Sequence, residues 1–166
     1  MSGTDSDSVY VESTIIMTTV RVIAPFVFTF GLFVMFHGAD SAGGGFQGGV
    51  LVAAAVLLLA FASGIESTRA WLAGPLTRTA IATGGAVFAA VGLGAIALDG
   101  AFLEYVAYDF GSTGVKYGIE LVELGIGAVV SGVLVGLFFS LASGDFEPIV
   151  GDEPDGDADA AGGEGS

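Results

Sequence analysis

Residues 48–65 read GGVLVAAAVLLLAFASGI, a stretch of 18 positions without one charged side chain. About 20 helical residues, each rising 1.5 Å, cross the ~30 Å hydrocarbon core of a bilayer. A transmembrane barrel strand has only about ten residues and alternates apolar with polar positions, which this stretch does not. The stretch therefore predicts a membrane-spanning α-helix.

Three further apolar runs occupy residues 15–36, 80–98 and 119–142. The chain of 166 residues is 53% hydrophobic and 13% charged, with a mean hydropathy of +0.81. A soluble domain usually carries about 25% charged residues, so this chain has too few polar side chains to cover a water-facing surface of its size. We expect an all-α fold: a polytopic membrane protein with four transmembrane helices and a glycine-rich loop between helices 1 and 2.

The first run contains Arg21, whose charge would cost about 2.5–3.5 kcal/mol or more near the bilayer centre. We therefore expect Arg21 to lie at the membrane interface, with the hydrocarbon span beginning at about Val22. Pro25 then falls in the first turn of the span, where its missing N–H does little harm. Residues 9–20 would form a helical lead-in near the membrane surface.

Acidic residues concentrate at the two ends of the chain, which carry 11 of its 18 Asp and Glu residues. Acidic segments rich in glycine and alanine have little apolar surface to bury and remain disordered. We expect disordered tails at residues 1–14 and 144–166 around a transmembrane domain at residues 15–143. The acid excess and the single lysine fit a halophilic source, and they argue against a nucleic-acid-binding surface.

The four basic residues indicate an orientation in the cell membrane. In a four-span topology Arg21, Arg69 and Arg78 share one side with both termini, and Lys116 lies on the other side. Because basic residues favour the cytoplasmic side, we expect both termini in the cytoplasm. Trp71, beside Arg69 in the second loop, fits the aromatic belt of a membrane interface.

Side chains that carry cofactor chemistry are scarce. The chain has no cysteine, which excludes disulfides, thiolate-bound iron–sulfur clusters and thiol nucleophiles. One histidine, His37, leaves no bis-histidine haem and no histidine-rich metal site. We expect no cofactor, no metal site and no catalytic residue, so the chain is not predicted to be an enzyme.

Small residues recur every four positions in two of the runs and so lie on one helix face. They are Ala128, Gly132, Gly136 and Ser140 in the fourth run, and Ala82, Ala86, Ala90 and Gly94 in the third. Small residues let helix backbones approach closely, which promotes helix association in lipid. These stripes either pack the four helices together or dock against other membrane subunits.

Residues 37–49, between the first two runs, read HGADSAGGGFQGG. No Gly-Lys-Ser/Thr follows the glycines, and a membrane helix rather than a strand precedes them, so neither a P-loop nor a dinucleotide-binding motif is indicated. Gly43, Gly44 and Gly45 permit positive φ and close backbone approach. The segment predicts either a tight interhelical turn or a loop packed into a neighbouring protein.

This segment resembles the signature of the B subunit of Mrp-type (Mnh) multisubunit Na⁺/H⁺ antiporters. In that family an apolar helix ends in His-Gly, and a Gly-Gly-Gly-Phe-Gln-Gly-Gly run leads into a second apolar helix. Residues 118–125 (GIELVELG) also resemble the family, and Ala42 stands where it usually has proline. The resemblance covers roughly residues 21–141. The matching loop residues are His37, Gly38, Gly43, Gly44, Gly45, Phe46, Gln47, Gly48 and Gly49.

The resemblance implies a small membrane subunit that acts only together with the other subunits of a complex exchanging cytoplasmic Na⁺ for external H⁺. Those subunits and the lipid bilayer would be its partners. The chain itself would act in assembly of the complex and in lining the ion path. The alternative is an accessory membrane subunit of a related proton- or sodium-translocating hydrogenase or respiratory complex. A self-sufficient transporter is disfavoured, because the runs hold almost no ionisable group at mid-depth.

Three residues are candidates for the ion path. Glu120 and Glu123 are three positions apart and project from one helix face. With the fourth span beginning at residue 119, Glu123 would lie only about 6 Å inside it. The two acids either line an ion route shared with another subunit or, near Lys116, complement the helix dipole. His37 is either a proton relay or a capping group.

The remaining polar residues of the loops also have two interpretations. Asp40 and Gln47 either bind a hydrated cation or satisfy backbone groups of the glycine-rich loop. Asp99, Glu104 and Asp109, between the third and fourth runs, either attract cations to that face or belong to a solvated loop.

Overall fold

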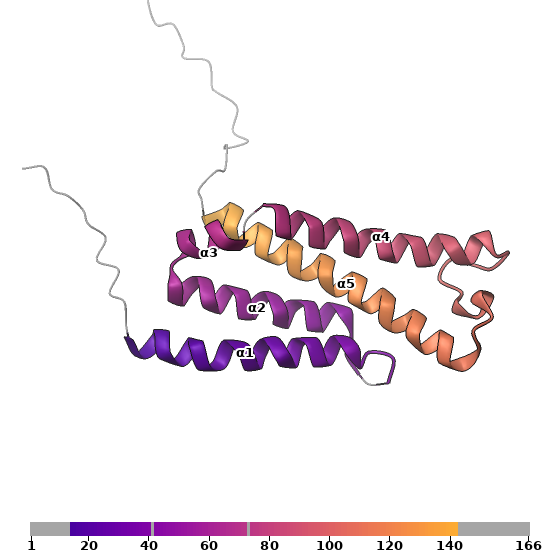
Figure 1. Ribbon diagram of the computed structural model, residues 1–166, viewed down its shortest axis with the longest axis horizontal. Coiled ribbons are helices and arrows are strands. Elements are labelled where there is room, and N and C mark those ends of the chain that lie inside the picture. Colours follow the sequence, from indigo (N-terminus) through magenta and orange to yellow (C-terminus); the bar gives the residue numbers. More distant parts are fainter. Residues whose placement is uncertain (1–13, 41, 73, 143–166) are drawn as a thin grey trace, which may run out of the picture.

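The computed structural model describes residues 14–40, 42–72 and 74–142. These residues form α1 (Thr14–Phe36), α2 (Gly45–Ser63), α3 (Ile65–Leu72), α4 (Pro75–Ala97), the 3-10 helix η1 (Tyr105–Tyr108) and α5 (Gly111–Ala142), shown in Figure 1. No strand occurs in this part of the chain, so the all-α prediction is confirmed. Thr14, assigned to the first tail, begins α1. All the other residues of the two predicted tails, 1–13 and 144–166, lie outside the described ranges.

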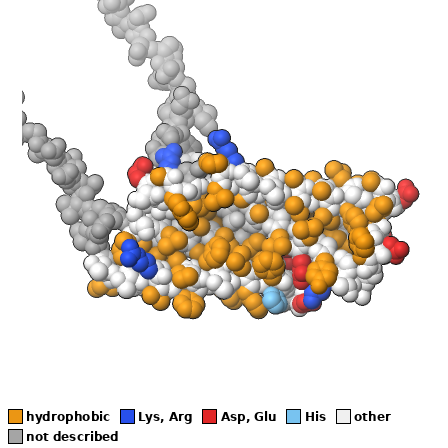
Figure 2. Space-filling model, viewed as in Figure 1, with side chains coloured by type: hydrophobic (Ala, Val, Ile, Leu, Met, Phe, Trp, Pro, Cys, Tyr) orange, Lys and Arg blue, Asp and Glu red, His pale blue; other side chains and the backbone are white. Residues whose placement is uncertain are grey.

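Four helices, α1, α2, α4 and α5, are long and apolar enough to cross a membrane, as predicted. Side chains that a soluble protein would bury lie on their surfaces: Phe26 is 72% exposed and Phe33 53%. Figure 2 shows hydrophobic side chains across the visible face of the helices. An apolar surface this extensive is stable when lipid or other membrane helices cover it.

The long helices form a row in the order α1, α2, α5, α4. Helix α2 packs against α1 and α5, and α5 packs against α2 and α4, with a smaller contact between α1 and α5. Within the described residues α4 touches neither α1 nor α2. A single row leaves two broad faces open, and its buried hydrophobic residues are mostly alanine and valine, with no large side chain fully buried.

Close backbone approach joins the neighbouring helices. A Cβ on Gly48 of α2 would lie 2.7 Å from the carbonyl oxygen of Gly31 in α1, and a Cβ on Gly49 would lie 2.7 Å from that of Gly127 in α5. A Cβ on Gly125 of α5 would lie 2.8 Å from the carbonyl oxygen of Gly84 in α4. No larger residue fits at these points without a shift of the backbone. Glycine therefore allows the van der Waals contact that holds helices together in lipid.

The two small-residue stripes have different surroundings. On α5 the stripe faces α4: a Cβ on Gly132 would lie 2.8 Å from Cγ1 of Ile81, and one on Gly136 would lie 3.3 Å from Cγ2 of Thr77. Internal packing therefore accounts for these α5 positions. On α4, Ala82, Ala86 and Ala90 are exposed instead, so docking against another subunit stays a prediction for that stripe.

The position of Pro25 in its helix and the start of the fourth long helix differ from the sequence-based expectation. Pro25 lies inside α1, eleven residues after its start, so its missing N–H does not fall at the start of a helix; where the hydrocarbon span begins stays a prediction. Proline adopts a helical φ, and the Thr29 hydroxyl donates a 2.7 Å hydrogen bond to the Pro25 carbonyl. The fourth helix begins at Gly111 rather than at residue 119. It starts there because Asp109 (φ 54°) and Gly111 (φ 65°) take left-handed conformations that separate η1 from α5.

The hairpins are staggered along the row. The described ends, Thr14 and Ala142, lie at one end of the molecule, as an even number of spans requires (Figure 1). At the other end α4 and α5 extend past the loop between α1 and α2 (Figure 1). The short helix α3 connects α2 to α4 at the first end, where Trp71 is 79% exposed. Which side of the membrane each end faces stays a prediction.

Replacing Gly84 by Leu should destabilise the contact between α4 and α5 by about 1–3 kcal/mol or more, because the side chain overlaps α5 backbone at Gly125. Gly85 provides a matched control, since a Cβ there meets no atom within 4 Å. Thermal unfolding in detergent should show a lower Tm for Gly84→Leu and an unchanged or higher Tm for Gly85→Leu. Equal Tm values for the two variants would contradict the packing.

Candidate functional site

The glycine-rich motif forms the loop between α1 and α2 and the first turn of α2. The chain turns at His37, whose carbonyl accepts a 3.1 Å hydrogen bond from the Asp40 backbone N–H. Gly43 has φ +131°, a conformation that side chains rarely adopt. Gly44 is extended and precedes α2, and its carbonyl accepts the first helical hydrogen bond, from Gly48, at 2.9 Å. Positive φ thus explains only one of the consecutive glycines.

Glu123 of α5 explains the others, because the loop closes over its side chain. A Cβ on Gly44 would lie 2.5 Å from Oε1 of Glu123, and a Cβ on Gly38 would overlap the same carboxyl group. A Cβ on Gly45 would overlap the backbone carbonyl oxygen of Glu123. We call Gly38, Gly44 and Gly45 the glycine clasp. These three motif positions lack side chains where Glu123 occupies the space.

Glu123 is half-buried, and its Oε2 atom is inaccessible to solvent and has no hydrogen-bond partner among the described residues. Glu120, one turn earlier, is also half-buried. Tyr105 of η1 lies near Glu123. Burial is the larger cause, and the negative charge of Glu123 the smaller, of a raised pKa for the Tyr105 hydroxyl. Tyr105 therefore lies within electrostatic range of the Glu123 carboxyl group.

The position of Glu123 along its helix differs from the expectation. Glu123 lies twelve residues into α5, and seven residues, or about 10 Å, beyond Lys116. Its neighbour Gly125 packs on Gly84, which lies six residues from Arg78 in α4. Glu123 is therefore about 10 Å along the helix axes from Lys116 and about 12 Å from the level of Arg78. Because α5 begins at Gly111 rather than at residue 119, Glu123 lies far from the start of its helix, whereas its depth in the membrane stays a prediction.

An ion pair connects the loop to α5. Lys116 Nζ contacts Asp40 Oδ2, and the two side chains are 45% and 54% exposed. An exposed pair of this kind contributes about 0–1 kcal/mol, so it orients the loop more than it stabilises the fold. Neither role predicted for Asp40, binding a cation or satisfying backbone groups of the loop, includes this contact. It could not be predicted because it joins residues 76 positions apart.

His37 sits at the end of α1 and is exposed. Its Nδ1 lies 3.0 Å from the Phe33 carbonyl oxygen, and its ring stacks on Phe33 with the centroids 4.1 Å apart. These contacts match the capping alternative. A proton-relay role for His37 stays a prediction.

The polar residues of the loop between α4 and α5 are largely accounted for by the backbone. Glu104 Oε2 accepts a 2.6 Å hydrogen bond from the Ala101 N–H. Asp99 (φ 64°) and Asp109 (φ 54°) hold left-handed positions, which Asp tolerates better than most residues. Across the described ranges no group of three or more His, Cys, Asp or Glu side chains could hold a metal ion. Cation attraction by this loop stays a prediction.

Substituting Gly44 by Val should displace the glycine-rich loop from α5, because the new side chain competes with the Glu123 carboxyl group for the same space. We expect a loss of stability of about 1–3 kcal/mol, measured as a lower Tm in detergent. Adding Glu123→Ala to Gly44→Val removes the obstructing carboxyl group and should recover most of the loss. A double variant no more stable than Gly44→Val would show that the clash does not involve Glu123.

Comparison with known proteins bears on the identity of the chain. A family model described as a domain related to the MnhB subunit of Na⁺/H⁺ antiporters matches residues 15–136. The matched region contains all four candidate spans except the ends of α1 and α5, together with the whole glycine clasp and Glu123. A search of curated proteins found no match. Because the family model covers well over half of the chain, this protein belongs to the MnhB family of Na⁺/H⁺ antiporter-related membrane subunits.

Proposed function

We propose that this chain is a non-catalytic subunit of a multisubunit monovalent cation/proton antiporter in the cell membrane, and that Glu123 forms part of the ion path. The observation that supports the ion-path role most is the carboxyl group of Glu123, held under the glycine clasp with one oxygen that has no partner among the described residues. Membership of the MnhB family supports the antiporter assignment.

The position of Glu123 supports an ion-binding role on energetic grounds. A carboxylate about 10–12 Å along the helix axes from the basic residues Lys116 and Arg78 is costly to keep ionised in a membrane without a partner. Binding a proton or a monovalent cation removes that cost, and either is cargo of an antiporter. Intramembrane acidic residues are rare, and they usually mark ion or proton routes. The helix-dipole alternative loses support, because α5 begins twelve residues before Glu123.

One carboxyl group does not make a route through the membrane. Within the described spans the other charged side chains are Arg21, Arg78, Lys116 and Glu120, and Lys116 is already paired with Asp40. A complete path needs titratable groups on both sides of Glu123, which other subunits would supply. The open faces of the helix row provide the area for such contacts, and they support a role in assembly.

Glu123→Gln should reduce Na⁺/H⁺ exchange to the level of membranes without the complex, because an amide of similar size cannot take up or release a proton. Glu120→Gln is the matched control, since Glu120 lies outside the clasp and should retain most exchange. The assay is Na⁺-dependent pH change in everted vesicles carrying the full complex, with the amount of assembled complex measured in parallel. Normal exchange by Glu123→Gln in an assembled complex would refute the ion-path role.

A further inference from the structure

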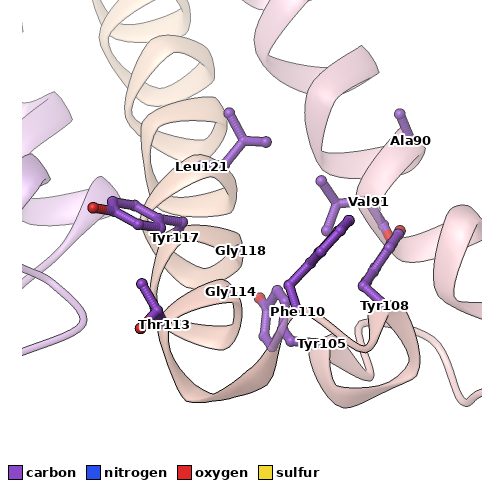
Figure 3. A pocket seen from close by; sticks show the side chains of 10 residues that line it. All are labelled: Ala90, Val91, Tyr105, Tyr108, Phe110, Thr113, Gly114, Tyr117, Gly118 and Leu121. Carbon is purple, nitrogen blue, oxygen red and sulfur yellow. The ribbon is translucent and has the colours of Figure 1, made fainter.

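A second site lies at the end of the molecule opposite to Thr14 and Ala142. A cavity of about 570 Å³ opens between α4, η1 and the first turns of α5 (Figure 3). Its volume falls within the ~300–1,000 Å³ typical of small-molecule sites. The proposed ion path does not use it, because Glu123 faces the glycine clasp and does not line the cavity.

Glycines on α5 make room for the aromatic walls. A Cβ on Gly118 would lie 2.7 Å from Cδ1 of Tyr105, and one on Gly114 would overlap Phe110. The Tyr108 hydroxyl donates a 2.6 Å hydrogen bond to the Val91 carbonyl oxygen, which anchors the loop to α4. Figure 3 shows the rings of Tyr105, Tyr108 and Phe110 between the two helices. The cavity is thus built by specific contacts.

The cavity crosses the expected edge of the hydrocarbon core. Ala90 on its α4 wall lies twelve residues, or about 18 Å, from Arg78, which leaves this wall within a ~30 Å core. On α5, Thr113 and Tyr117 line the cavity on either side of Lys116 in the sequence. Tyrosines concentrate where hydrocarbon meets head groups. One part of the cavity therefore lies at hydrocarbon depth and the other at head-group level.

The chemistry of the lining follows the same division. Ala90, Val91 and Leu121 offer an apolar wall, on which a hydrocarbon chain is more stable than water. The hydroxyls of Tyr105 and Thr113 can donate hydrogen bonds to ester or phosphate oxygens. These features suit an amphiphile that has a long apolar chain.

Charge around the cavity selects the head group. Glu104 precedes Tyr105 in the sequence and Asp109 lies between Tyr108 and Phe110, and both acids are exposed. The only basic residue at this end, Lys116, is paired with Asp40. Exposed carboxylates disfavour a purely anionic head group and attract an ammonium group, which aromatic faces also bind.

We propose that this cavity binds one membrane lipid, with a hydrocarbon chain against Val91 and Leu121 and an amine-bearing head group near Glu104 and Asp109. The cavity is a lipid site that stabilises the connection between α4 and α5. A partner subunit filling the same space is the competing outcome.

Photo-crosslinking tests this site directly. The full complex is reconstituted in vesicles that contain a photoactivatable phosphatidylethanolamine with its diazirine on the acyl chain, and labelled peptides are identified by mass spectrometry. We expect labelling of residues 90–121, competed more strongly by unlabelled phosphatidylethanolamine than by phosphatidylglycerol. Equal competition would overturn the head-group assignment, and absent labelling, or labelling of a partner subunit alone, would overturn the lipid site.

Variants provide the second arm of the test. Gly118→Leu fills the cavity from α5 and should abolish the labelling, whereas Gly85→Leu, at an open position of α4, should preserve it. Ala90→Phe fills the cavity from the α4 wall and serves where Gly118→Leu fails to fold. Unchanged labelling in either cavity-filling variant that assembles normally would refute the proposal.

Discussion

Contact between helix backbones at glycine is the interaction on which the rest of this structure depends. In lipid, apolar side chains gain little by leaving the hydrocarbon, so helices associate where their surfaces fit closely. Here Gly31 and Gly48, Gly49 and Gly127, and Gly84 and Gly125 meet at the three successive interfaces of the row. Without these contacts a single row of helices, with no large side chain fully buried, would have little to hold it together.

The same constraint creates the candidate site. Helix α2 can start against α5 because Gly45 leaves room for the Glu123 carbonyl oxygen, and Gly38 and Gly44 leave room for its carboxyl group. The stagger of the two hairpins then places this short loop well inside the length of α5. A non-helical segment beside membrane helices is stable where protein surrounds it, and α5 provides that protein surface. Packing of the glycine-rich loop thus centres on one side chain, that of Glu123.

Hydropathy and run length were sufficient to predict the all-α fold and the four spans, because lipid imposes a length and an apolar composition on each helix. The family followed from the glycine motif. The partnership of the motif with Glu123 could not be predicted, since it joins residues about 80 positions apart and leaves no local pattern. The start of the last helix was missed because residues 111–118 are too polar to be counted as part of an apolar run, although they are helical. The available signals were the glycines of residues 43–49 and an acidic residue, Glu123, in an apolar span. Only the fold showed that they are in contact.

Cross-linking of the glycine-rich loop to α5 tests this account most directly. The natural chain has no cysteine, so Asp40→Cys and Lys116→Cys introduce the only thiols, and a short bifunctional thiol reagent should join them within one chain in native membranes. Asp40→Cys with Arg78→Cys, at opposite ends of the molecule, should give no such product. Efficient cross-linking of the first pair alone is the predicted result. No cross-link for that pair, in a chain that assembles normally, would mean that the glycine loop does not lie on α5.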